Sequence, residues 1–158
     1  MSRSLFYDED YVLAMLLRQA SDTVLRARQA ELTNIGITTI EAATLLAIED
    51  LGERALPTRI SEWILRRPNS TSALLQRMEK DGLVMRARDL ERKNLVRIAL
   101  TDHGREVLQK VLIRSSLNQV FGELSAEEKE SLKPALLHLR TAALELLREK
   151  APPVPKLG

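Results

Sequence analysis

The sequence predicts a mainly α-helical protein with one small β-hairpin, in which a winged helix-turn-helix lobe is joined to N- and C-terminal dimerisation helices. Apolar residues recur at three- and four-residue steps over most of the 158 residues, as in amphipathic helices. Residues 56–101 have the order helix, short turn, helix and hairpin, which is typical of winged helices that bind DNA. Residues 54–97 contain 11 basic and 5 acidic residues, although the whole chain has a net charge of only +2. This local excess favours binding to phosphates, and a solvated charged surface is the alternative.

The composition argues against several other kinds of protein. The chain has no apolar run long enough to span a bilayer, and its acidic residues 7–10 do not resemble a signal peptide, so we expect a cytoplasmic protein without membrane contact. The absence of cysteine excludes disulfides, thiolate zinc sites and thiol redox sensing. His103 and His138 have no partner at ligand spacing, so we expect surface or packing roles for them. No metal and no cofactor is predicted.

The first two helices are separated by a short break. The first is predicted from residue 7 to about residue 31 and ends before the sequence Asn-Ile-Gly-Ile at residues 34–37. Thr38 followed by Glu41 forms a capping-box pattern, which starts a second helix that runs to about residues 51–52.

A third and a fourth helix are predicted to follow with only a few residues between them. Pro57 suits the first turn of the third helix, whose buried side is supplied by Ile60, Trp63, Ile64 and Leu65. Pro68 ends this helix and starts the fourth, with Arg67 or Asn69 as its N-cap and residues 81–82 as its end.

The second half of the chain is predicted to form a hairpin and two long helices. Residues 84–88 and 95–100 favour strands, and the charged tip at residues 89–94 makes them a wing. Thr101 caps a fifth helix that ends near residues 121–122. Ser125 and Glu128 form a second capping box, which starts a sixth helix through Leu147. The proline-rich residues 151–158 are predicted to be an extended or disordered tail, or a strap on a partner subunit.

The fourth helix carries the candidate DNA-reading residues. Thr71, Leu74, Leu75 and Met78 share one face by their spacing, which leaves small and polar residues on the other. Such residues can enter the major groove, while the helix N-terminus favours a phosphate. Gln76 and Arg77 have the chemistry for a base edge or its flanking backbone. The predicted DNA-binding residues of this helix and its start are Arg67, Asn69, Ser70, Ser72, Ala73, Gln76, Arg77 and Lys80.

The wing supplies further cations. Arg92 and Lys93 at its tip suit the negative potential of the minor groove, and Arg88 lies on the strand before them. Asp89 and Glu91 offer an alternative, because they could pair with these cations as weak surface salt bridges. Arg88 in particular could be held by either acid to stiffen the wing.

Several short motifs occur in an order that resembles the MarR family of bacterial transcriptional regulators. They are GIT at residues 36–38, STSALLQRMEKDGLV at 70–84, RD at 88–89, LTDHGRE at 100–106 and LSAEE at 124–128. The resemblance covers about residues 8–150. It implies a homodimer whose first, fifth and sixth helices interleave, binding a pseudo-palindromic double-stranded DNA site with two recognition helices. It also implies a repressor or an activator that often responds to small amphipathic ligands.

The resemblance gives a single domain over residues 1–158. Within it, residues 8–35 and 101–150 are dimerisation helices, residues 36–100 are the winged lobe, and residues 151–158 are a flexible or strapping tail. The wing departs from the family pattern Asp-Pro-x-Asp-Arg-Arg, because residues 89–94 read Asp-Leu-Glu-Arg-Lys-Asn. Trp63 also stands where the family has a small or aliphatic residue, and we expect it to pack in the lobe rather than narrow a ligand cleft.

The residues favour a DNA-binding regulator over two other classes. The apolar faces of the terminal helices exceed what a lobe of about 70 residues needs, and a homodimer would bury them. An adaptor that binds protein through its winged helix is the alternative, but charge is usually depleted in the cores of protein interfaces. An enzyme is not expected, because the chain lacks an acid and base pair, a nucleophile elbow, a phosphate loop and a metal set.

Overall fold

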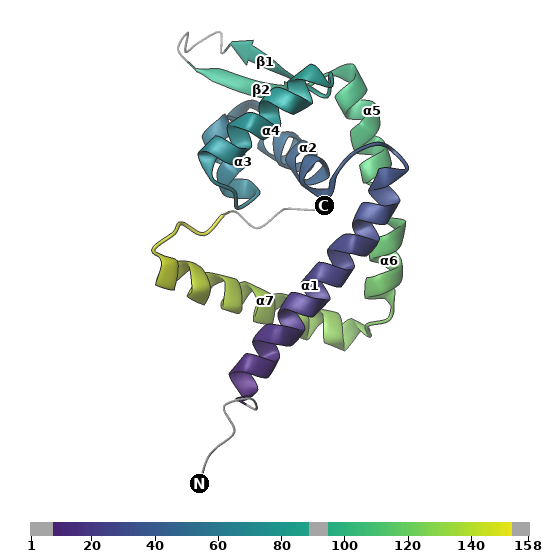
Figure 1. The fold of residues 1–158 in the computed structure, drawn as a ribbon, viewed down its shortest axis with the longest axis vertical. Helices are drawn as coiled ribbons and strands as arrows, with labels where there is room; N and C mark the ends of the chain where they lie inside the picture. Colours follow the sequence, from purple (N-terminus) through teal and green to yellow (C-terminus); the bar gives the residue numbers. More distant parts are fainter. Residues whose placement is uncertain (1–7, 89–94, 153–158) are drawn as a thin grey trace.

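The computed structural model describes residues 8–88 and 95–152 (Figure 1). It confirms the predicted fold class, because the described residues form helices and one two-stranded antiparallel hairpin. The elements are, in order, α1 (Glu9–Thr33), α2 (Thr39–Leu51), the 3-10 helix η1 (Gly52–Arg54), α3 (Pro57–Trp63), α4 (Pro68–Lys80), β1 (Val84–Arg88), β2 (Val96–Leu100), α5 (Asp102–Val111), α6 (Ser115–Gly122) and α7 (Ala126–Leu147).

Both predicted capping boxes are present. The Thr38 hydroxyl accepts a hydrogen bond from the Glu41 backbone N–H (3.3 Å), and Glu41 Oε2 accepts one from the Thr38 N–H (2.9 Å). Ser125 and Glu128 make the same reciprocal bonds at the start of α7. These bonds satisfy N–H groups that have no partner within the helix, so both boundaries are fixed locally.

The lobe is built from α2, α3, α4 and the hairpin, and lies at one end of the molecule (Figure 1). Its core is apolar and closed, because Leu45, Ile60, Leu75, Met78 and Ile98 are almost completely buried. At the other end, α1 runs beside α6, while α5 leads from the hairpin towards α6. The lobe therefore joins the remaining helices through α1 and α5.

The hairpin is tied to the lobe at its base. Val84 pairs with Leu100, and both side chains are buried in the core. The Ile98 N–H donates to the Ala55 carbonyl (2.8 Å), which attaches β2 to the segment after η1. This anchoring sets the direction in which the two strands leave the lobe.

The structure corrects the predicted fifth helix. In place of one helix from residue 101 to about residue 122, α5 ends at Val111 and α6 begins at Ser115. Between them Arg114 adopts a left-handed conformation (φ 52°), which cannot continue an α-helix. The apolar periodicity continues across this break, which is why the pattern alone predicted one helix.

Leu65 is a second correction. It was expected on the buried side of the third helix, but it lies beyond the end of α3 and its side chain is 54% exposed. Its φ of 52° places it in the left-handed region, so its side chain points away from the face that the helical spacing would give it.

The apolar faces of the terminal helices are largely uncovered in one chain. On α7 the leucines at positions 132, 136, 139 and 147 are exposed, and Leu144 is buried. On α1 the exposed large apolar residues are Tyr11, Val12, Leu13, Leu16, Leu17 and Leu25. Among the residues that the structure describes, no helix combines the length and apolarity needed to cross a bilayer.

Candidate nucleic-acid interface

The turn between α3 and α4 is short and tightly hydrogen-bonded. At the end of α3 the Arg66 N–H donates to the Ser61 carbonyl (3.0 Å) and the Leu65 N–H donates to the Glu62 carbonyl (3.3 Å). This pair of bonds is the Schellman pattern, whose central residue must be left-handed. Leu65 occupies that position at a conformational cost that glycine would avoid. The turn directs the chain into the first residue of α4.

Helix α4 begins with Arg67 as its N-cap. The backbone of Arg67 is extended (ψ 144°), as expected for a residue before proline, and its side chain makes no capping bond. This settles the choice between Arg67 and Asn69, which lies in the first turn. The backbone N–H groups of that first turn have no partner within the helix, so the N-terminus of α4 can bind an anion.

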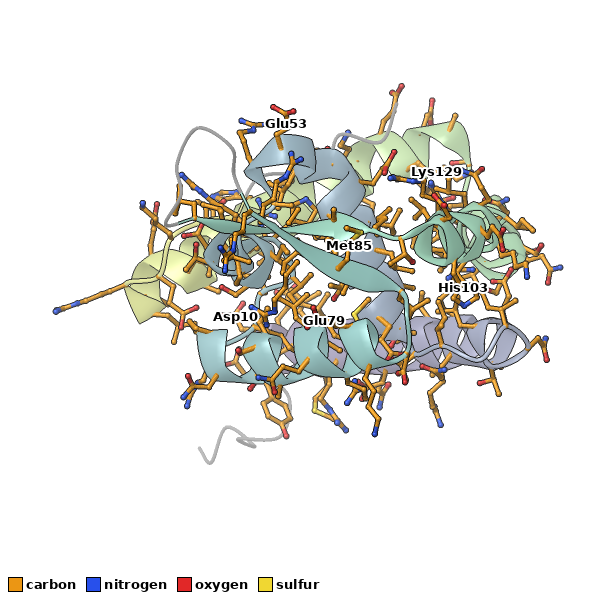
Figure 2. All side chains as sticks on the ribbon, turned by 90° about the horizontal axis from the view of Figure 1, so that it is seen from above. Asp10, Glu53, Glu79, Met85, His103 and Lys129 are labelled. Atoms are coloured by element: carbon orange, nitrogen blue, oxygen red, sulfur yellow. The ribbon has the colours of Figure 1, made fainter. Side chains whose placement is uncertain are left out.

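The two faces of α4 are separated as the sequence predicted. Thr71, Leu74, Leu75 and Met78 are buried in the lobe. Figure 2 shows α4 at the edge of the lobe, with side chains directed away from the hairpin. Every predicted DNA-binding residue at the start and along the helix is exposed, namely Arg67, Asn69, Ser70, Ser72, Ala73, Gln76, Arg77 and Lys80. The described part of the chain thus presents a continuous polar helix face.

Arg77 is held by a residue that sequence reasoning did not assign to the site. Its Nε–H donates to Oε1 of Glu41 on α2 (3.1 Å), while the other carboxylate oxygen of Glu41 accepts from the N–H and hydroxyl of Thr38 (both 2.9 Å). The Glu41 side chain is 9% exposed and that of Arg77 is 55% exposed. The carboxylate therefore anchors the inner edge of the guanidinium and leaves its outer part at the surface. The capping box revealed one role of Glu41, but its contact with a residue 36 positions away had no sequence signal.

Glu41 is ionised at neutral pH. Burial alone would raise its pKa, but the bonds from the backbone and hydroxyl of Thr38 and from Arg77 outweigh burial and hold the pKa below its ordinary value. The negative charge is stable in this position and keeps Arg77 oriented across the physiological pH range.

The wing arginines divide between contacts within the lobe and exposure. Arg86 on β1 donates to Glu79 on α4 (3.2 Å), so it joins the hairpin to α4. Arg97 lies 3.8 Å from Glu53 at the side of η1. Arg88, at the end of β1, is exposed. Arg92 and Lys93 lie outside the described residues, so their predicted contacts remain predictions.

Trp63 packs against the lobe core, as expected. Its indole Nε1–H donates to Asp50 on α2 (3.0 Å), and its ring is partly buried. The tryptophan thus braces α3 against α2. Within the part of the chain that the structure covers, no group of three or more His, Asp or Glu side chains could hold a metal ion.

The chain is similar in sequence and in structure to transcriptional regulators. No family model matches the chain. The chain is 28% identical to the HTH-type transcriptional regulator SarZ of Staphylococcus epidermidis over 120 aligned residues. This alignment covers 75% of this chain and 78% of SarZ. The structure is similar to that of the organohalide-sensing transcriptional regulator RdhR with 2,4-dichlorophenol bound, with a TM-score of 0.84 and 26% identity over 99% of this chain and 96% of RdhR. It is also similar in fold to a mutant of Escherichia coli MarR complexed with operator DNA, with a TM-score of 0.74 and 20% identity over 86% of this chain and 98% of MarR.

Proposed function

From the MarR-type winged-helix fold that this chain has, we propose that it is a sequence-specific, double-stranded-DNA-binding transcriptional regulator. The observation that carries the proposal is the exposed polar face of α4, on which Arg77 is held in place by the buried carboxylate of Glu41. An interaction adaptor would gain nothing from a charged, small-residue helix face, because the cores of protein interfaces are usually depleted in charge. SarZ and MarR support the same assignment through their roles as a regulator and a binder of operator DNA.

In this proposal α4 enters the major groove. The short side chains of Ser72 and Ala73 allow close approach, and Gln76 and Arg77 reach base edges. Arg67 and the first-turn N–H groups bind a phosphate on one side of the groove. Arg88, with Arg92 and Lys93 of the wing tip, binds the adjacent backbone or minor groove.

The chain acts as a homodimer. The exposed apolar residues of α1 and α7 form extensive surfaces that a second copy would bury. A twofold dimer presents two copies of α4 about one helical turn of DNA apart, so its operator is pseudo-palindromic. Bound across a promoter, such a dimer represses transcription.

Release by a small amphipathic molecule completes the proposal. RdhR, which is similar to this chain over nearly its whole length, binds 2,4-dichlorophenol. The dimer would have two states that differ in the spacing of its recognition helices, and only one of them would fit the operator. A ligand that binds the other state more tightly would lower operator affinity, to an extent set by the difference in its affinity for the two states. Titration of a protein–operator complex with chlorinated phenols tests this part of the proposal, and an unchanged operator affinity at saturation would exclude this ligand class.

Fluorescence anisotropy tests the DNA-binding function directly. The full chain is titrated with the DNA that flanks its own gene, with duplexes selected from a random library and with scrambled duplex, each at two salt concentrations. We expect tight, sequence-dependent binding that weakens steeply with salt. Arg77→Ala should lower affinity about 5- to 150-fold and relax sequence preference. Arg18→Ala, which removes an exposed arginine of α1, is the matched control and should leave the preference unchanged. Failure to select any preferred sequence from the library would contradict the proposal.

A further inference from the structure

An ion pair between a buried arginine and a partly exposed glutamate of α1 lies at the junction of the lobe and the terminal helices. Arg28 is 7% exposed, and its Nη1 donates to Glu31 Oε2 (2.6 Å). The same guanidinium donates through Nη2 to the carbonyl of Val111, the last residue of α5. Arg28 thus satisfies a carbonyl at the C-terminus of a helix 83 positions away, where a positive charge is also favoured by the helix dipole.

Glu31 caps the helix on the other side of the break. Its Oε1 accepts from the Ser115 N–H (2.8 Å), and its Oε2 accepts from the Ser116 N–H (3.2 Å) and from the Ser116 hydroxyl. The residue at the N-cap position of α6, Arg114, makes no capping bond of its own. The Glu31 carboxylate of α1 therefore accepts hydrogen bonds from the first backbone N–H groups of α6, as the side chain of a local N-cap residue usually does.

These contacts lie on both sides of the break between α5 and α6. Apolar periodicity favours one helix over residues 102–122, and the left-handed conformation of Arg114 is unfavourable for a residue other than glycine. Backbone bonds such as that from the Ile113 N–H to the Lys110 carbonyl (3.2 Å) close the end of α5, but Arg114 provides no side-chain cap for α6. Arg28 and Glu31 satisfy backbone groups on both sides of the break. The contacts are polar and directional, and they combine a buried arginine with a carboxylate side chain that is 24% exposed.

The same turn of α1 also holds the lobe. Gln29 Oε1 accepts from the N–H of Thr39, the first residue of α2 (2.9 Å), and Gln29 Nε2 donates to the Ile37 carbonyl (3.1 Å). One turn of α1 therefore contacts the start of α2, the end of α5 and the start of α6. In Figure 1 these helix ends meet where the lobe joins α1 and α6.

We propose that Arg28 and Glu31 are a positioning pair that maintains the α5–α6 break, and that they thereby set the distance between the two recognition helices of the dimer. The inference rests on the proposed function, because only a dimer has two recognition helices. The residues do not contact DNA in this proposal. They determine which spacing of half-sites the dimer fits, whereas the exposed face of α4 determines which bases are read.

Electron–electron distance measurements test the inference without DNA. Because the chain has no cysteine, Ser72→Cys provides one spin-labelling position per chain on the exposed face of α4. The distance between labels in the dimer is compared in this background and after adding Glu31→Gln or Arg28→Met. Asp22→Asn, which breaks an exposed ion pair with Arg18 on the same helix, is the matched control. We expect a narrow distribution for the background and the control, and a shifted or broadened one for the two positioning variants.

Two further readouts separate positioning from a general loss of structure. The 13Cα chemical shift of Arg114 should move from its left-handed value towards the right-handed helical value in Glu31→Gln, with the core of the lobe unchanged. On a series of operators that differ only in half-site spacing, the optimum should change, while the preferred half-site sequence should not. The inference would be wrong if both variants fold and match the background in inter-label distance, in the Arg114 chemical shift and in the optimal half-site spacing. That result would leave the proposed function standing. Absence of any inter-label distance in the background would overturn the homodimer, and this inference with it.

Discussion

The contact between Arg77 and Glu41 leads to a quantitative prediction about how the Arg77 side chain is oriented on α4. We consider Glu41→Gln, Arg77→Met and the double variant. Glutamine keeps the size of the side chain and removes its charge, while methionine keeps most of the arginine stem and removes the guanidinium. The double variant shows whether the two residues act together.

The structure fixes the expected sizes. Glu41 accepts two bonds from Thr38 and one from Arg77 in a site where it is 9% exposed. Replacing charged by neutral acceptors should weaken the two Thr38 bonds by about 1 kcal/mol each, so Glu41→Gln should lower the free energy of unfolding by about 1–2 kcal/mol. Arg77 is more than half exposed, and solvent screens its share of the pair, so Arg77→Met should lower the free energy of unfolding by less than about 1 kcal/mol.

DNA binding should respond in the opposite order. Loss of the guanidinium in Arg77→Met should weaken operator binding by about 1–3 kcal/mol. Loss of the Glu41 charge should weaken binding less, because the Arg77 side chain is still present and is only freed to adopt other rotamers. Once Arg77 is absent, removing the Glu41 charge should have no further effect on affinity. The coupling free energy in the double-mutant cycle should therefore be at least about 0.5 kcal/mol.

Urea unfolding and operator anisotropy give the two sets of free energies for all four proteins. Glu79→Gln is the control, because it also breaks an ion pair to an arginine, Arg86, from the surface of α4. It should change stability by less than about 0.5 kcal/mol and should not couple to Arg77. Effects of Glu41→Gln and Arg77→Met on affinity that simply add would refute the conclusion that Glu41 orients Arg77.

Three other predictions concern the frame around this surface. A Cβ at Gly104 would lie 1.9 Å from the Leu83 carbonyl oxygen, so Gly104→Ala should lower the free energy of unfolding by about 1–3 kcal/mol or more, measured in urea. Gly122→Ala is its control and should instead raise it by up to about 1 kcal/mol, because nothing lies within 4 Å of the added atom. Leu65→Gly should raise the melting temperature, because glycine relieves the left-handed conformation there; a clear decrease would show that the exposed leucine has a packing role. The pKa of Glu31 is lowered from 4.5 to about 2, chiefly by the hydrogen bond from the Ser116 hydroxyl; burial opposes this shift and Arg28 adds to it. Because the pKa is lower in the folded state, the ionised carboxylate stabilises the fold above pH 4.5, and this stabilisation is lost as the pH falls towards 2. The stability difference between the natural protein and Glu31→Gln should therefore shrink over that range, and a constant difference would contradict the assigned bonds.

The features that sequence could predict are those fixed within a few residues. Thr38 and Glu41 predict the start of α2, because the capping bonds join residues only three positions apart. The spacing of Thr71, Leu74 and Met78 is sufficient to assign the buried face of α4. The polar face opposite follows from the same spacing, which is why the candidate residues of α4 are all exposed.

The features that sequence could not predict depend on distant partners. The periodicity of residues 102–122 is compatible with one helix or two, and the choice depends on Arg28 and Glu31 more than 80 positions away. Likewise, the spacing that placed Leu65 on a buried face assumed that α3 continued through it, whereas α3 ends at Trp63 in a Schellman turn, two residues before Leu65.

In the proposed function, Glu41 and Glu31 have separate roles in presenting α4 to DNA, and measuring both the half-site sequence preference and the half-site spacing optimum of each variant tests this separation. Glu41 acts within the lobe, so Glu41→Gln should relax the preferred half-site sequence and leave the optimal half-site spacing unchanged. Glu31 acts between the lobe and the terminal helices, so Glu31→Gln should change the optimal spacing and leave the half-site sequence unchanged. Both carboxylates satisfy helix N-termini, both have lowered pKa values and both are close to an arginine, so a general loss of stability would affect the two assays alike. Only separate positioning roles predict that each substitution moves one property and not the other. A single pattern of change common to both variants would show that the lobe and its junction respond as one unit.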